Sequence, residues 1–370
     1  MMKRYSAIAA ALILPFALTA CMQGGESTSE LNADDFKDPV AGEVAEGSLD
    51  GTTMTFVSWG GGFQDGQTKA FSEPFAKQSG AEVLSDGPTD AAKLKAQVDS
   101  GNVSWDAINA SPTQNAANCG TLFEKLDLSL IDTSKIPEGT PQGDCYLPSL
   151  VYVYGMFYDA DKYGDNPPTG WKDFFDTDKF PGTRAVEGRP SATAGTFEAA
   201  LLADGVKPDD LFPLDTKRSL KKWDTIKKDV KYWQTGAEQT QMAQAGEADM
   251  IFGWSGRIYE ANQNGSNFKP VWDQGFLASD TFSIAKDSPN KIAAHAYINY
   301  ALGAKQQAEM AEATSYSPVN VDSKPKFEGE AKEFNVTRPE VLDVTLPQNA
   351  DYWGENQEEL YAAWGDWLNK

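Results

Sequence analysis

Between residues 52 and 109 the chain alternates strand-like and helix-like segments, and this alternation limits the possible folds more than any other feature. Short β-rich segments occupy residues 52–58, 81–84 and 105–109, with apolar residues at helical spacing between them. The alternation predicts an α/β fold, in which helices cover both faces of a parallel sheet. Ligands of such sheets bind beyond the carboxyl ends of the strands. The residues expected there follow the first and third segments, and they are Trp59, Phe63, Ser111 and Thr113.

The start of the chain has the organisation of an export signal. Two basic residues precede an apolar stretch at residues 7–20, which is too short to cross a bilayer of about 30 Å as a mature helix. The stretch runs into the sequence LTAC at residues 18–21, which resembles a bacterial lipobox. We therefore expect residues 1–20 to be a lipoprotein signal peptide and Cys21 to carry the lipid. An ordinary signal peptide followed by an incidental cysteine is the alternative.

An acidic segment, residues 21–51, follows the signal. Residues 22–50 contain eight acidic residues and one lysine, together with many glycine, serine and alanine residues. A segment of this composition buries too little apolar surface to offset the entropy lost on ordering, so we expect a flexible tether. The lipid on Cys21 would then hold the chain on a membrane of the cell envelope, facing the periplasm or the extracellular side.

The charge and composition of the chain exclude several classes of function. The formal net charge is −22, so a phosphate backbone would be repelled, and we expect no nucleic-acid partner. A single histidine in 370 residues excludes the paired histidines of HExxH zinc enzymes, and we expect no metal, no cofactor and no catalytic residue. The many carboxylates leave one enzymatic alternative, a secreted hydrolase that uses two of them. At about 150 residues per domain, the length predicts two domains.

The cysteine count predicts one disulfide bond. If Cys21 carries a lipid, Cys119 and Cys145 are the only pair left in an exported chain, where paired cysteines are commonly oxidised. The bridge would close a loop rich in proline and glycine, a constraint worth about 3 kcal/mol. Two free thiols are the alternative.

Six further segments carry a signal through their order along the chain. They are VSWGGGFQ at 57–64, WKDFFDTDKFPG at 171–182, FEAALLADGV at 197–206, GEADMIFGWSGRIYEA at 246–261, SDTFSIAKDSPN at 279–290 and ATSYSPVN at 313–320. Together they resemble the extracellular solute-binding proteins of ABC importers, and specifically the spermidine/putrescine-binding group, whose members are polyamine-binding lipoproteins or periplasmic proteins.

The resemblance implies a two-lobe periplasmic-binding-protein fold, type II-like, with a ligand cleft between the lobes and closure by hinge bending. Lobe 1 is expected to consist of residues 52–152 and 281–316, and lobe 2 of residues 153–280 and 317–370. The resemblance further implies a monomer that catalyses no reaction and delivers its ligand to the permease subunits of an ABC transporter.

The same resemblance assigns several residues to the ligand site. In the polyamine-binding group, aromatic side chains enclose a methylene chain, and carboxylates bind its ammonium groups. Trp59 and Trp254 match aromatic positions of that group, and Asp280 matches a carboxylate. Trp233 begins a loop that is aimed at the cleft in this group, with core packing as the alternative. We expect Tyr152, on a strand that crosses between the lobes, to pack in the core.

Two departures from the group's pattern affect the choice of ligand. The group's acidic pair falls on Ala192 and Gly195, and an aromatic position falls on Ala278. Arg189, in the same loop as Ala192, instead offers a partner for a carboxylate. We therefore expect a small organic amine as the ligand. A polyamine such as putrescine or spermidine comes first, and an ω-amino acid such as γ-aminobutyrate, or another small solute, is the alternative.

Overall fold

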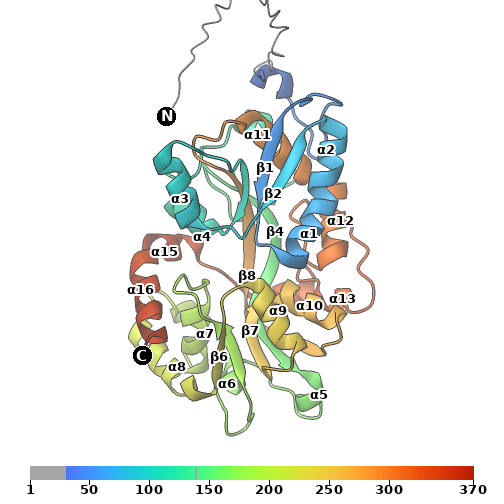
Figure 1. Cartoon of the computed structure of the whole chain (residues 1–370). Coiled ribbons are helices and arrows are strands. Elements are labelled where there is room, and N and C mark those ends of the chain that lie inside the picture. Colours follow the sequence, from blue (N-terminus) through green and yellow to red (C-terminus); the bar gives the residue numbers. More distant parts are fainter. Residues whose placement is uncertain (1–30, 138–139) are drawn as a thin grey trace, which may run out of the picture. The chain divides into compact units, whose positions relative to one another are not determined.

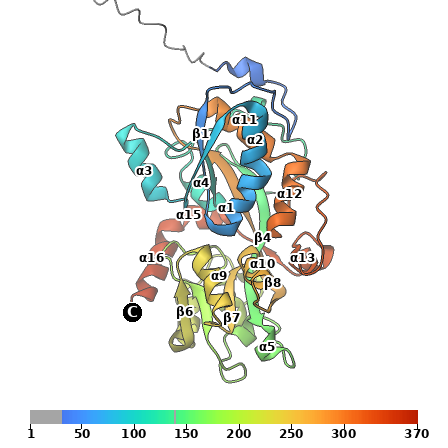
Figure 2. The same ribbon diagram turned by 45° about the vertical axis from the view of Figure 1, so that its right-hand side comes forward.

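The computed structural model describes residues 31–137 and 140–370, so Cys21 and the predicted signal peptide lie outside the described residues. Nine strands form one mixed sheet, with helices on either side of it (Figures 1 and 2). The strands are β1 (Thr53–Val57), β2 (Glu82–Asp86), β3 (Ala107–Ala110), β4 (Leu147–Asp159), β5 (Arg184–Glu187), β6 (Val230–Trp233), β7 (Met250–Trp254), β8 (Phe268–Ile284) and β9 (Leu346–Pro347).

Sixteen α-helices are found in the described part of the chain, and none of them is long and apolar enough to cross a membrane. They are α1 (Gly61–Gln67), α2 (Glu73–Ser79), α3 (Ala91–Ser100), α4 (Pro112–Ala117), α5 (Ala160–Tyr163), α6 (Trp171–Phe174), α7 (Thr196–Ala203), α8 (Thr216–Asp224), α9 (Gly236–Gln244), α10 (Ser255–Gln263), α11 (Lys291–Ala301), α12 (Ala304–Thr314), α13 (Ala331–Phe334), α14 (Pro339–Leu342), α15 (Ala350–Glu355) and α16 (Gln357–Leu368).

Two long strands, β4 and β8, connect the two ends of the sheet. The strand order is β2-β1-β3-β8-β4-β7-β5-β6, and β9 pairs with β8. Strands β1–β3 are parallel to one another, as are β5–β7, whereas β4 and β8 pair antiparallel with each other and with their neighbours β7 and β3. Figure 1 shows β4 and β8 running between the part of the molecule around β1 and the part around β7. The predicted α/β, two-lobe fold is therefore confirmed, but the sheet is mixed rather than wholly parallel.

We call the part around β1–β3 the first lobe and the part around β5–β7 the second lobe. Strand β8 begins at Phe268 in the second lobe and continues into the first, where it ends at Ile284. Both crossing strands are continuous through the middle of the sheet. The predicted points of change between the lobes, after residues 152 and 280, therefore stay predictions.

Local sequence signals explain how the ends of the strands near the cavity described below are shaped. After β1, Gly60 and Gly61 have φ angles of 74° and 63°, a left-handed conformation that glycine adopts without strain. Ser111 caps helix α4 after β3, and Pro112 occupies the first helical position, where its missing N–H costs nothing. Thr235 caps α9 in the same way after β6. Strands β1, β3 and β6 therefore each turn within a few residues into a helix.

The C-terminal helix α16 belongs to the aromatic core of the second lobe. Trp223 of α8 lies parallel to Phe252 of β7, with ring centroids 6.4 Å apart, and edge-on to Trp364, with centroids 5.6 Å apart. Trp364 in turn stacks on Trp367 at 4.7 Å. Because these side chains are fully buried, the C-terminal segment is a structural part of this lobe.

The end of the acidic segment 21–51 is packed against the first lobe, and here the prediction of a flexible tether is wrong. The Gly42 N–H donates to the Asn299 carbonyl oxygen at 3.0 Å, and the Leu49 N–H donates to that of Ser79 at 2.8 Å. The Leu49 side chain is completely buried. Composition predicted disorder, but a few apolar side chains and backbone hydrogen bonds are enough to dock this stretch.

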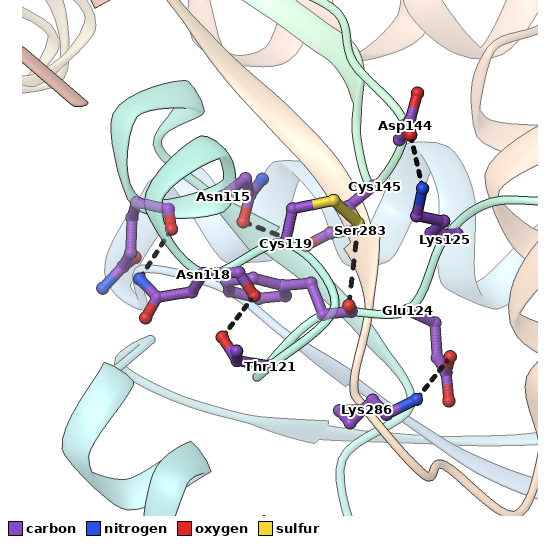
Figure 3. Close-up of a disulfide and its surroundings, with 12 residues drawn as sticks. Asn115, Asn118, Cys119, Thr121, Glu124, Lys125, Asp144, Cys145, Ser283 and Lys286 are labelled. Carbon is purple, nitrogen blue, oxygen red and sulfur yellow. Dashed lines mark hydrogen bonds and ion pairs between the residues drawn. A yellow bond between two sulfur atoms is a disulfide. The ribbon is translucent and has the colours of Figure 1, made fainter. Parts of the chain in front are cut away.

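The predicted disulfide bond between Cys119 and Cys145 is present (Figure 3). It joins the turn after α4 to the residues that precede β4, with the two Cα atoms 5.5 Å apart. Two ion pairs lie beside it, Lys125 with Asp144 and Lys286 with Glu124. The bond therefore fixes the carboxyl end of α4, whose amino end lies at the cavity described next.

Candidate ligand-binding site

A cavity of about 550 Å³ lies where the strand ends and loops of the two lobes meet. Its walls come from the segments after β1, β3 and β5, from the carboxyl end of β7, from the amino end of α16 and from part of β8. Seven of the eight residues that the sequence assigned to the ligand site line this cavity: Trp59, Phe63, Ser111, Thr113, Arg189, Trp254 and Asp280. Residues from distant parts of the chain are therefore brought together at one place.

Asp280 is the buried carboxylate of the cavity. It lies in β8 opposite Leu150 of β4 and is 6% exposed. Burial raises the pKa of Asp280 to about 7, and polar contacts from Trp59 and Tyr152 act in the opposite direction. The Tyr152 hydroxyl lies 3.4 Å from Asp280 Oδ1. A buried carboxylate whose hydrogen-bond partners are neutral groups is suited to bind a cation, because an ammonium group would offset the cost of its ionisation.

Arg189 presents a guanidinium group to the same cavity. Its Nε donates to Glu187 Oε1 at 2.5 Å, and Glu187, at the end of β5, is almost fully buried. The Thr193 N–H donates to the other oxygen of Glu187 at 2.9 Å, which holds that carboxylate in place. The Arg189 guanidinium also packs over the Trp254 ring, 5.3 Å from its centroid. Glu187 and Trp254 therefore orient the Arg189 guanidinium toward the cavity.

Trp233, the eighth predicted site residue, does not line the cavity, and the alternative prediction of core packing is the one that the structure shows. Its side chain is completely buried behind Trp254, with ring centroids 4.6 Å apart at an angle of 61°. It ends β6, where its register partner is Glu187 of β5. Trp233 thus supports the cavity wall from behind, because it packs on the side chain that reaches the surface of the cavity.

Tyr152 was expected to pack in the core, but it lines the cavity and contacts Asp280. Tyr154, two residues further along β4, stacks on Phe252 with centroids 4.1 Å apart, and its hydroxyl lies 3.5 Å from Glu187 Oε2. Alternation along the strand predicts that both tyrosines share one face, but it does not reveal which face borders the cavity.

Arg257 is a functional candidate that the sequence did not single out. It lies in the first turn of α10 in the second lobe, and its Nη2 donates to the carbonyl oxygen of Gly60 in the first lobe at 2.9 Å. Its Nη1 lies 3.1 Å from Glu260 Oε2, and its guanidinium lies 5.8 Å from the centroid of the Phe63 ring. Arg257 therefore bridges the two lobes at the glycine-rich turn.

The C-terminal segment forms a wall of the cavity that sequence reasoning also missed. Trp353 of α15 donates its Nε1–H to Glu198 of α7 at 2.7 Å, and burial raises the pKa of Glu198 to about 7. The Gln348 side-chain amide donates to the Ala194 carbonyl oxygen at 2.6 Å. Helix α15 also packs against α4 of the first lobe. None of the six recognised motifs extends beyond residue 320, so no signal pointed to this wall.

The charged side chains that line the described cavity are balanced between acids and bases. They are Asp90, Asp280, Arg189 and Arg257. Asp90 is exposed and caps α3, which leaves Asp280 as the buried carboxylate. Among the residues that the structure describes, no group of three histidine, cysteine or acidic residues is placed to hold a metal ion. The cavity therefore offers one site for a cationic group and a nearby site for an anionic group.

Comparison with known proteins gives a consistent result. The sequence profile of the family described as bacterial extracellular solute-binding protein matches residues 70–335. A gamma-aminobutyric acid-binding protein from Pseudomonas aeruginosa is 30% identical over 323 residues, which cover 85% of this chain and 90% of that protein. A putrescine-binding periplasmic protein from the same species is 24% identical over 279 residues, covering 68% and 75%. A solved structure of a GABA receptor has 36% identity and a TM-score of 0.76, over 86% of this chain and 98% of that one.

Proposed function

The chain belongs to the bacterial extracellular solute-binding proteins, and we propose that its ligand is a small zwitterion with separated ammonium and carboxylate groups, such as γ-aminobutyrate (GABA). Members of this family bind a solute for an ABC transporter and are not enzymes, so no reaction is assigned to the cavity. The names of two relatives, a gamma-aminobutyric acid-binding protein and a GABA receptor, support the choice.

The observation that carries the proposal is the presence of one buried carboxylate and one oriented guanidinium in the same cavity. Asp280 would receive the ammonium group of the ligand, because pairing offsets the cost of ionising a buried acid. Arg189 would receive the carboxylate, since a guanidinium offers several N–H donors to a planar anion. Glu187 already pairs with Arg189, so a ligand carboxylate would use the N–H groups that this pair leaves.

The aromatic residues favour a ligand with a short methylene chain. Trp59 and Phe63 line the side of the first lobe and would cover the chain between the two charged groups. The Trp254 backbone is fixed by Gln239, which both accepts from its N–H and donates to its carbonyl oxygen at 3.1 Å. The Arg189 guanidinium packs over the Trp254 ring, so Trp254 positions this side chain of the protein.

A diamine such as putrescine, our first expectation from the sequence, is the second candidate. Asp280 and Trp59 suit its first ammonium group, and a relative at 24% identity is named for putrescine. The polyamine-binding proteins have acidic residues at two positions for the second ammonium group, and this chain has no acid at either position. Ala192 lines the cavity, and a side chain at Gly195 would begin 2.5 Å from the Phe276 ring. Arg189 would further repel a second cation.

Titration calorimetry with GABA and with putrescine at pH 8 tests the proposed function. We expect GABA to bind at least ten times more tightly than putrescine, because only GABA pairs both Asp280 and Arg189. Butylamine and butyrate, which each keep one charged end, are the matched controls and should bind more weakly than GABA. Tight binding of putrescine without binding of GABA would overturn the proposal.

We further propose that Cys21 carries a lipid and that closure bends the crossing strands β4 and β8. Cys21 and the lipobox-like sequence lie outside the described residues, so the proposal of a lipid on Cys21 rests on the sequence. The variant Cys21→Ser should leave the protein unprocessed or release it from the membrane fraction. Unchanged membrane attachment of this variant would refute a lipid on Cys21, without affecting the assignment of the cavity.

A further inference from the structure

The second lobe touches the first at the glycine-rich turn after β1, and one arginine makes this contact. Helix α10 packs against α1, which begins in this turn (Figure 2). Arg257 of α10 donates from Nη2 to the Gly60 carbonyl oxygen at 2.9 Å, and its guanidinium lies 5.8 Å from the centroid of the Phe63 ring. Trp59 and Phe63, on either side of the three glycines, both line the cavity. Arg257 therefore holds the turn that carries two cavity side chains.

Contacts within the second lobe orient the Arg257 side chain. Its Nη1 lies 3.1 Å from Glu260 Oε2, and the Thr240 hydroxyl of α9 lies 3.4 Å from the same oxygen. Gly236 begins α9, and a side chain at this position would collide with the guanidinium. The guanidinium is thus held in place by its own lobe. Its hydrogen bond to Gly60 is an additional bond that only the meeting of the two lobes provides.

The glycines of the turn make room for this contact. A Cβ atom at Gly61 would lie 3.0 Å from Arg257 Nη1, and one at Gly62 would lie 2.8 Å from Glu260 Oε1. Gly61 also has a positive φ angle, whereas Gly62 is a residue of α1 without one. Gly62 is not among the residues that line the described cavity. The lack of a side chain at Gly62 is therefore explained by the approach of the other lobe.

We propose that Arg257 is a positioning residue that slows the release of the ligand, because it holds the two lobes together at the glycine-rich turn. Its bond to Gly60 forms only where the lobes meet, so it stabilises the closed arrangement and leaves capture by open lobes unchanged. Loss of a hydrogen bond from a charged donor shifts such an equilibrium at least tenfold. The inference rests on the proposed closure of the lobes and uses GABA as its probe.

The rate of GABA release tests this role of Arg257. Stopped-flow measurements at pH 8 follow GABA through the fluorescence of Trp59 and Trp254, which line the cavity. We expect Arg257→Met to release GABA at least tenfold faster than the wild type and to capture it at a rate within threefold. Arg218→Met is the matched control, because Arg218 pairs with Asp204 inside the second lobe, and both of its rates should stay within twofold. A smaller increase in release, or a loss confined to capture, would overturn the inference.

A variant on the opposite lobe provides a second measurement and covers the case in which Arg257→Met does not fold. Gly62→Leu adds a helix-favouring side chain outside the cavity, so the empty protein should keep its melting temperature. Release of GABA should again be at least tenfold faster, because the leucine occupies the space that Glu260 needs. Both substitutions disrupt one contact, so the double variant should release GABA no more than threefold faster than the faster single variant. Multiplication of the two effects, or release at the wild-type rate in Gly62→Leu, would contradict the inference.

Failure of this inference and failure of the proposed function give different results. If the wild type binds GABA and both variants release it at the wild-type rate, Arg257 has no part in retaining the ligand and the proposed function stands. If the wild type does not bind GABA, the proposed function fails, and the same rates measured with putrescine test Arg257. If neither ligand binds, both proposals fail.

Discussion

Replacing Asp280 by asparagine should remove amine binding while making the empty protein more stable. Asp280→Asn keeps the size of the side chain but leaves the ligand's ammonium group without a buried counter-charge. Removal of one partner of a buried charge pair costs about 2–5 kcal/mol, so the affinity for GABA should fall at least 30-fold. Asp90→Asn is the matched control, because Asp90 also lines the cavity but is exposed, and asparagine can cap α3 equally well. We expect less than a threefold change for this control.

The same substitution should increase the stability of the empty protein above neutral pH. Folding raises the pKa of Asp280 from 3.8 to about 7, because the carboxyl is buried. Between these values the folded state holds a proton that the unfolded state has released, so the contribution of Asp280 to stability is lost as pH rises through about 7. The cost amounts to about 4 kcal/mol at most, at roughly 1.4 kcal/mol per pH unit. Asp280→Asn avoids this cost, and its melting temperature at pH 8 should exceed that of the wild type.

The pH dependence of binding separates this explanation from a general loss of structure. An ammonium ligand requires ionised Asp280, and at pH 5 only about one molecule in a hundred has this group ionised in the empty protein. The affinity of the wild type for GABA should therefore fall about 100-fold between pH 8 and pH 5, with proton release on binding near pH 6. Titration calorimetry in buffers of different ionisation enthalpy measures both quantities. Affinity that is independent of pH in the wild type, or unchanged in Asp280→Asn, would refute the reasoning.

Three further predictions concern groups around the cavity. Arg189→Lys should weaken GABA at least tenfold in titration calorimetry and change butylamine binding by less than threefold, and equal losses for both ligands would contradict the role of Arg189. Glu198→Gln should raise stability at pH 8 and flatten its decline between pH 5 and pH 8, because burial raises the pKa of Glu198 to about 7; thermal melts across this range would show whether the decline persists. The double variant Cys119→Ser/Cys145→Ser should lose about 3 kcal/mol in urea unfolding, and a change below 1 kcal/mol would exclude a stabilising role for the bridge.

Sequence patterns were sufficient where a site residue lies close to the end of a recognisable strand. Trp59 and Ser111 follow β1 and β3 within two residues, so alternation of strands and helices was enough to place them at the cavity. The docked residues 40–51 were misjudged, because composition describes an average, whereas the burial of Val44 and Leu49 depends on a particular complementary surface.

Residues whose role depends on packing between distant segments could not be placed in this way. Trp233 and Tyr152 lie on strands with two possible faces, and only the packed sheet shows which face borders the cavity. Gln348 and Trp353 come from a segment without a motif, and they reach the cavity because α15 packs between α4 and α7. Arg257 contacts a turn of the other lobe, so its partner is remote in the sequence.

A crystal structure of the protein with bound GABA tests the central claim most directly. The account predicts that the ammonium group lies within hydrogen-bonding distance of Asp280 and that the carboxylate contacts Arg189, with the methylene chain beside Trp59. GABA bound in the reverse orientation, or bound away from both Asp280 and Arg189, would contradict the account.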